Sequence, residues 1–488
     1  MSHDNLGFTS SNDGLDAKRW SSSTSKNSPS YLPDENRTNV YVLELDEKKK
    51  RTKKKSVEEY DAGEYEPYDH RDVVHPTTNS ETLLHLLKGS LGTGILAMPK
   101  AFLNSGYIVG MIATIIIGLL CTYCMRILVT SEYELCKRKR VPSLTYPATA
   151  EAALREGPPV FRRCAKAAIH VTNTFLIIYQ LGACCVYVVF IASNIQTALS
   201  TYIQPIDVRL YMVALLLPLI FINWIRNLKY LAPLSTVANG ITFISFGIIL
   251  YYIFRQTPSF ENRNPVGEVQ NFPLYFGTVL FALEAIGVIM PLENEMKTPK
   301  HFISPFGILN IGMGTIVFLY AGMGFFGYIC YGSEIHDSIT LNLPDKDVLS
   351  KVVQILLAIA IFFTHTIQCY VAIDISWNDY ISPMLEKNSH RLLWEYVVRT
   401  VIVIITTLLA IAVPKLELFI SLFGAFCLSA LGIAFPAIIQ LCTFWNTVTR
   451  TERNLMLAKN LSLILFGLLG LVVGTYTSLH EMVKSFAR

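Results

Sequence analysis

The feature that most constrains the fold is a series of long apolar stretches, each about 20 residues, separated by short polar ones. A helix of that length crosses the hydrocarbon core of a bilayer, where every backbone donor and acceptor must find a partner within the protein. The sequence therefore predicts an all-α polytopic membrane protein with about eleven transmembrane helices. The expected spans are 81–104, 106–130, 164–199, 210–225, 229–254, 273–293, 303–331, 349–373, 393–413, 416–443 and 459–479.

The first 80 residues differ in composition from the rest of the chain. They are polar and carry a basic run at Lys48–Lys55, so they bury too little apolar surface to offset the entropy of ordering. We expect a disordered tail over 1–80 and a transporter domain over 81–488. A basic run suits nucleic acid or anionic lipid, and beside a membrane domain we favour a juxtamembrane tail and no nucleic acid.

The charge of the loops predicts the orientation. Lys and Arg concentrate in the loop 131–163, whereas loops 255–272 and 332–348 carry few. Positive loops stay in the cytosol, so we expect a cytosolic amino terminus and an extracytoplasmic carboxyl terminus.

The first span contains residues that a plain membrane anchor would not need. The run KGSLGTG places small and polar residues in mid-span, beside His85 and Lys88: Gly89, Ser90, Gly92, Thr93 and Gly94. One interpretation is a small-residue seam between helices. The other is an unwound segment whose backbone groups line a polar cavity, which also accounts for the neighbouring charged residues.

The sixth span repeats this pattern. In FALEAIGVIMPLEN, Glu284 lies deep in apolar sequence, with Ala285 and Gly287 beside it and Pro291 one turn later. An ionisable residue at that depth is costly and is a functional candidate by default, although a structural carboxyl bonding to a neighbouring helix is the alternative.

The spacing of the two breaks predicts an inverted repeat. Spans one and six are five helices apart, and an odd number makes two five-helix repeats, about 81–254 and 273–443, enter the membrane in opposite directions. The span 459–479 is then an extra helix. Discontinuous helices meeting near the midplane are typical of secondary transporters. A half-helix amino terminus binds a carboxylate, and unwound carbonyls suit an ammonium, so the expected substrate is an amino acid.

Several long motifs carry a family resemblance. The runs His75–Phe102, Tyr179–Asn194, Phe281–Met296 and Gly327–Pro344 resemble the proton-coupled amino acid transporters of animals, within the amino acid/auxin permease superfamily. The resemblance implies a LeuT-type fold and symport of small neutral amino acids (alanine, glycine, proline type) with protons. It also implies proton coupling by His85, and histidine is the side chain whose unperturbed pKa lies within the physiological range. Glu284 is the second candidate for proton coupling, because a desolvated carboxyl has a raised affinity for protons.

Other positions bear on the details. The resemblance leads us to expect Cys330 unpaired, since the loop 201–209 lacks a cysteine, and the sequons at Asn36 and Asn460 fall on expected cytosolic positions, so no N-glycan is predicted. Thr364 and Thr366 flank His365 and suit a sodium site, so sodium coupling stays an alternative to protons. The scattered histidines predict no metal site, and no other cofactor is expected.

Rival functions remain open from the sequence. KGSLGTG lacks the order of a phosphate-binding loop, which argues against an ATPase, and we expect no enzyme. The tail, with Tyr60, Tyr65 and Tyr68, suits a cytosolic signalling partner if the chain acts as an amino-acid sensor. A uniporter or channel is the third alternative. The family resemblance fits the plasma membrane and the late endosome or lysosome alike.

Overall fold

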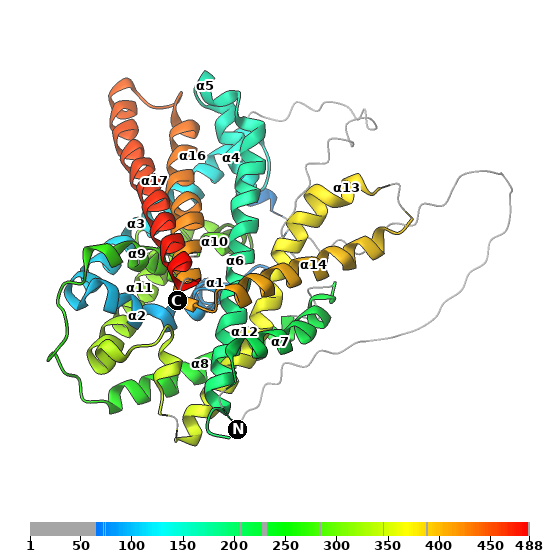
Figure 1. Ribbon diagram of the computed structural model, residues 1–488. Coiled ribbons are helices and arrows are strands. Elements are labelled where there is room, and N and C mark those ends of the chain that lie inside the picture. Colours follow the sequence, from blue (N-terminus) through cyan, green and yellow to red (C-terminus); the bar gives the residue numbers. More distant parts are fainter. Residues whose placement is uncertain are drawn as a thin grey trace, which may run out of the picture. The chain divides into compact units, whose positions relative to one another are not determined.

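The computed structural model describes residues 65–486 apart from 72, 74, 203, 205, 227–231, 284, 345, 387 and 388, all within one compact unit, Tyr41–Arg488. Over this part the chain is built from helices and their connections (Figure 1), of which those between α8 and α9 and between α11 and α12 are long. The first half contains α1 (Asn79–Ser90), α2 (Thr93–Ser105), α3 (Tyr107–Lys139), α4 (Tyr146–Glu156), α5 (Pro159–Arg162), α6 (Ala165–Leu199), α7 (Val208–Asn223) and α8 (Ala232–Arg255).

The second half follows with α9 (Phe272–Ala282), α10 (Ile286–Asn294), α11 (Ile308–Tyr331), α12 (Val348–Asp374), α13 (Ser382–Met384), α14 (Arg391–Ala412), α15 (Leu416–Phe423), α16 (Phe435–Phe444) and α17 (Arg450–Phe486). π-Helical segments join α12 to α13 (η8, Ile375–Ile381) and α15 to α16 (η9, Gly424–Ala434). Such segments are uncommon and often accompany functional sites.

The helices confirm a polytopic membrane protein. Nine helices of the described part are long and apolar enough to cross a membrane, and α7 is a shorter apolar helix. The remaining expected span, 81–104, is divided between α1 and α2. The expected span 164–199 matches α6, Ala165–Leu199. The count of eleven and the LeuT-type inverted repeat stay predictions.

Burial separates inner from outer helices. Along α6 most side chains are buried, and this helix packs against α12, α4 and α14. By contrast α17 exposes large apolar side chains such as Leu469, Val472 and Tyr476. Because apolar side chains of a spanning helix are stable against lipid, α17 is a peripheral helix with a lipid-facing side.

Two segments expected to be irregular are ordered. The expected tail 1–80 reaches into α1, which begins at Asn79 behind a capping box made by Thr78 and Glu81, and residues 65–71 contain the 3₁₀ turn η2 (Pro67–His70). The earlier residues, with Tyr60, Asn36 and the basic run, lie outside the described part. The expected loop 131–163 contains the end of α3 and the helices α4 and α5.

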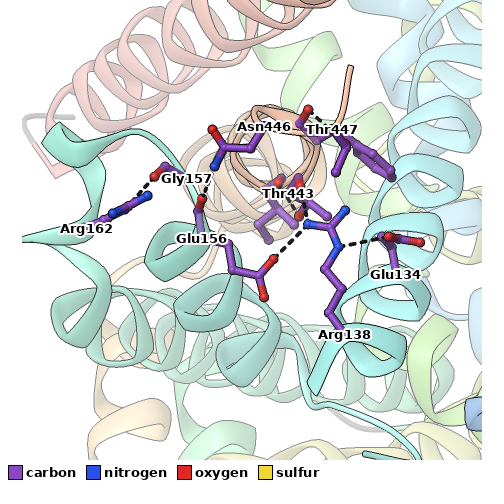
Figure 2. Close-up of polar contacts among 10 residues, drawn as sticks. Glu134, Arg138, Glu156, Gly157, Arg162, Thr443, Asn446 and Thr447 are labelled. Carbon is purple, nitrogen blue, oxygen red and sulfur yellow. Dashed lines mark hydrogen bonds and ion pairs between the residues drawn. The ribbon is translucent and has the colours of Figure 1, made fainter. Parts of the chain in front are cut away.

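A polar cluster around Arg138 fixes α4 in place (Figure 2). The Arg138 guanidinium lies between α3, α4 and α16: it donates to Glu134 Oε1 at 2.9 Å, to Glu156 Oε2 at 2.8 Å and to the Thr443 carbonyl at 2.8 Å. One arginine side chain therefore connects the consecutive helices α3 and α4 to α16, which lies far away in the sequence.

Candidate transport site

The first expected break is present. α1 ends at Ser90 and α2 begins at Thr93, with Leu91 and Gly92 between them outside helical geometry (φ −74°, ψ 83° and φ −124°, ψ −152°). The run KGSLGTG is therefore unwound at its centre, which the second interpretation of the sequence requires. That its backbone groups line a polar cavity stays a prediction.

The second expected break is present as well. α9 ends at Ala282 and α10 begins at Ile286, and the Ala285 carbonyl accepts hydrogen bonds from the Val288 and Ile289 amides, both at 3.0 Å. Glu284 lies in this break but outside the described residues. Gly287 and Pro291, expected to mark the interruption, belong to α10 itself.

The two breaks lie against each other. α1 packs on α10, and α2 packs on α9. At Gly94 a Cβ atom would come within 2.6 Å of the Ala282 Cα, and at Gly89 it would come within 3.6 Å of Val288 Cγ2. Residue numbers rise along the first broken helix as they fall along the second. The two broken helices are therefore antiparallel, and their interruptions lie side by side.

This crossing brings unlike helix ends into contact. The first backbone N–H groups of α2 and the last carbonyls of α9 have no partner in their own helices. They give the start of α2 a partial positive charge and the end of α9 a partial negative charge. Because Gly94 and Ala282 touch, donors for a carboxylate and acceptors for an ammonium lie side by side.

Polar side chains accompany these backbone groups. Thr93 is 1% exposed, and its hydroxyl has no hydrogen-bond partner among the described residues. Ser90 donates its hydroxyl to the Leu86 carbonyl at 3.1 Å. The Ser90 carbonyl accepts from the Gly92 amide at 2.9 Å and from the hydroxyl of Tyr320 on α11. Sequence reasoning did not find Tyr320, because a tyrosine in an apolar span gives no signal of its partner.

The proposed proton-coupling histidine, His85, does not lie inside the crossing of the broken helices. His85 lies on α1, one turn before Gly89, with its side chain exposed rather than inside the crossing. His365, on α12, is fully buried, and neither ring nitrogen has a hydrogen-bond partner in the described part. The neighbouring Thr364 and Thr366 hydroxyls donate to carbonyls of their own helix, at 3.0 and 3.3 Å. The coupling roles of these residues stay predictions.

A small cavity lies next to the second break. A cavity lined by Leu283, Ile286 and residues of α3 and η9 has a volume of about 10 Å³, enough for about one water molecule. An amino acid there would require the surrounding side chains or helices to move.

The far end of α2 is tied to α15. The Asn104 amide donates to Glu417 Oε1 at 2.5 Å, and the Lys100 ammonium lies 3.7 Å from Glu417 Oε2. The Glu417 backbone N–H donates to Asp337 Oδ2 at 3.4 Å. Glu417 thus connects α15 to the second half of the first broken helix through its carboxylate, and to the connection before α12 through its backbone N–H.

The chain resembles known proteins over most of its length. The sequence profile described as "Transmembrane amino acid transporter protein" matches residues 75–480. The chain is 40% identical over 425 residues to the "Proton-coupled amino acid transporter-like protein pathetic" of Drosophila melanogaster, covering 87% of this chain and 89% of that protein. It is 25% identical over 435 residues to the "Probable amino acid transporter skat-1" of Caenorhabditis elegans, covering 86% and 92%.

Proposed function

Because the chain belongs to the transmembrane amino acid transporter family, we propose that it moves small neutral amino acids of the alanine, glycine and proline type across a membrane together with protons. The observation that carries this proposal is the contact between the amino end of α2 and the carboxyl end of α9 at Gly94 and Ala282. A zwitterion matches the two opposite partial charges of these helix ends.

In this proposal the substrate carboxylate binds the first N–H groups of α2, with the Thr93 hydroxyl as a further donor. Its ammonium group binds carbonyls at the end of α9. The segments Gly89–Gly94 and Leu283–Gly287 then form the two sides of the site, and close packing at Gly94 restricts the substrate side chain to a small one. We also propose transport by alternating access, in which the two broken helices move to open the site to one side of the membrane at a time.

The coupling ion is the finer part of the proposal. The printed name of the Drosophila relative describes that protein as proton-coupled, and we extend the coupling to this chain. His85 and Glu284 are the proposed proton carriers, and sodium is the alternative ion. We propose that the protein lies in the plasma membrane or in the late endosomal and lysosomal membrane, with its amino terminus in the cytosol.

Uptake in cells with low background transport tests this function. We would measure radiolabelled alanine and proline uptake at pH 5.5 and 7.4, with and without sodium. Wild-type uptake should rise at acid pH and ignore sodium. His85→Ala should lose the pH response, while His301→Ala, which removes an exposed histidine in η5 (Pro299–His301), should keep it.

The contrary results are distinct. Sodium-dependent uptake would replace the proton as the coupling ion. Equilibration without accumulation against a gradient would indicate a uniporter or channel. No uptake of either amino acid by protein shown to be at the cell surface would contradict the proposed substrate class.

A further inference from the structure

The segment before α1 is bound to the rest of the protein by backbone and side-chain contacts. We call residues 65–78 the N-terminal strap. The Thr77 amide donates to the Glu295 carbonyl at 2.8 Å, and the Lys297 amide donates to the Thr77 carbonyl at 2.9 Å. At its other end the Tyr68 ring lies 4.8 Å from the Tyr133 ring of α3. The strap therefore runs from the end of α3 to the end of α10 and continues directly into α1.

Arg71 of the strap has a buried side chain with three hydrogen bonds to the rest of the protein. Its guanidinium donates to Glu293 Oε2 at 3.0 Å, to the Glu293 carbonyl at 3.1 Å and to the Pro142 carbonyl at 3.1 Å. The side chains of Arg71 and Glu293 are only 6% and 1% exposed. A charge pair this buried is far less screened than a surface pair and is costly to break on one side only.

A second buried carboxylate lies beside this pair. Glu132 of α3 is 1% exposed and interacts with the charges of both Glu293 and Arg71. Its direct partners are neutral donors: the Cys136 thiol at 3.0 Å and the Leu144 amide at 2.9 Å, both on Oε1. Tyr68 also approaches Glu293, and the pKa of its hydroxyl is raised by burial and by that carboxylate, so it stays a neutral donor.

The charges of this cluster do not balance without a proton. Two buried carboxylates face one guanidinium, and the remaining titratable neighbours, Tyr68 and Cys136, are neutral donors. An uncompensated buried carboxylate is avoided by taking up a proton. Glu293 forms an ion pair with Arg71, so Glu132 is the carboxylate that a proton must neutralise. We propose that Glu132, Glu293 and Arg71 form a proton-binding site that closes when the N-terminal strap docks, with the proton on Glu132.

The sign of the pH effect follows from this arrangement. Glu132 lies on α3 and Glu293 on α10, and the docked strap covers both. In the proposal these carboxylates reach water and regain ordinary affinities for protons when the strap leaves, so the docked state holds one more proton than the undocked state. Acid on the strap's side therefore favours docking, and docking weakens as pH rises above the ordinary carboxyl range. Because the strap leads into α1 and is bonded to the end of α10, docking also holds this end of the two broken helices closed.

The consequence for transport rests on the proposed function, whereas docking itself does not. If the strap lies in the cytosol, an acidic cytosol would hold the transporter closed on that side. Such a response limits the delivery of protons and substrate to a compartment that is already acidic.

Hydrogen–deuterium exchange of the full chain in lipid nanodiscs tests the site. Exchange of peptides covering the strap would be followed at pH 5.5 and 7.5 and divided by the intrinsic exchange rate at each pH. Wild-type protection should fall by roughly fivefold or more between these values, since one linked proton changes the docking equilibrium by up to tenfold per pH unit. Glu132→Gln keeps an oxygen acceptor without the charge, and it should hold the strap protected at both pH values.

Two further variants complete the comparison. Arg71→Ala should lose strap protection at both pH values. Arg163→Ala removes an exposed arginine next to α5 and should match wild type, while the α4 peptide reports whether the surrounding fold is intact. Strap protection independent of pH in wild type, or an unchanged pH dependence in Glu132→Gln, would overturn the proposal. Hydrogen–deuterium exchange of the strap does not depend on transport. A protein that takes up no amino acid can therefore still show the proton-binding site, and the two proposals are tested separately.

Discussion

Gly94 is the residue on which the crossing of the broken helices depends most directly. A Cβ atom there would lie 2.6 Å from the Ala282 Cα, whereas a Cβ at Gly92 meets nothing within 4 Å. We therefore expect Gly94→Ala to lower the free energy of unfolding by about 1–3 kcal/mol, the usual range for overpacking, and to reduce uptake. Gly92→Ala should leave thermal unfolding close to wild type. Equal melting temperatures for the two variants would contradict the close approach.

At this scale the sequence identified part of the site. The glycines and hydroxyls of KGSLGTG stood out because they interrupt an apolar span, and the structure places the break among them. Tyr320 did not stand out, although its hydroxyl bonds the Ser90 carbonyl, because that contact joins residues 230 positions apart. Local patterns reveal a broken helix but not the distant side chain that contacts it.

At the scale of elements, Arg138 joins α4 to α3 and α16 (Figure 2). Arg138 bonds Glu134, Glu156 and the Thr443 carbonyl, and these ion pairs are partly exposed. Exposed pairs contribute about 0.2–1 kcal/mol each, so Arg138→Ala should loosen α4 locally rather than unfold the protein. Faster amide exchange in Tyr146–Glu156 would show this. Arg155→Ala, which removes an exposed pair with Glu151, is the matched control and should change exchange little.

Apolar length predicted the spanning helices well, because crossing a bilayer sets a minimum length that can be read directly from the sequence. It did not predict α4, whose residues Tyr146–Glu156 have a mixed composition. This helix is held by contacts to α6, α16 and Arg138, and such tertiary contacts leave no periodic signal in so short a segment.

At the scale of the whole molecule, the described contacts of the amino-terminal region begin at Tyr65. Deleting residues 1–64 therefore removes none of the strap contacts made by Glu66, Arg71 and Thr77. We expect the shortened protein to keep its melting temperature and its amino acid uptake. Deleting residues 1–78 should lower the melting temperature, because the strap's hydrogen bonds to Pro142, Glu293 and Glu295 are lost. If deletion of residues 1–64 abolished uptake, the tail would be required for transport and not for signalling alone.

The pairing of Arg71 with Glu293 also constrains how the protein is made. The two residues are 222 positions apart, so at ordinary rates of synthesis the ribosome adds Glu293 on the order of 10–50 s after Arg71. We expect the first membrane helices to be inserted during that interval. Arg71 and Glu132 are then already synthesised, but Glu293, the third member of their cluster, is not. The amino-terminal segment is thus among the last parts of the first six spans to reach its final position. A nascent chain halted before residue 293 would present this segment to proteases and chaperones at the membrane surface.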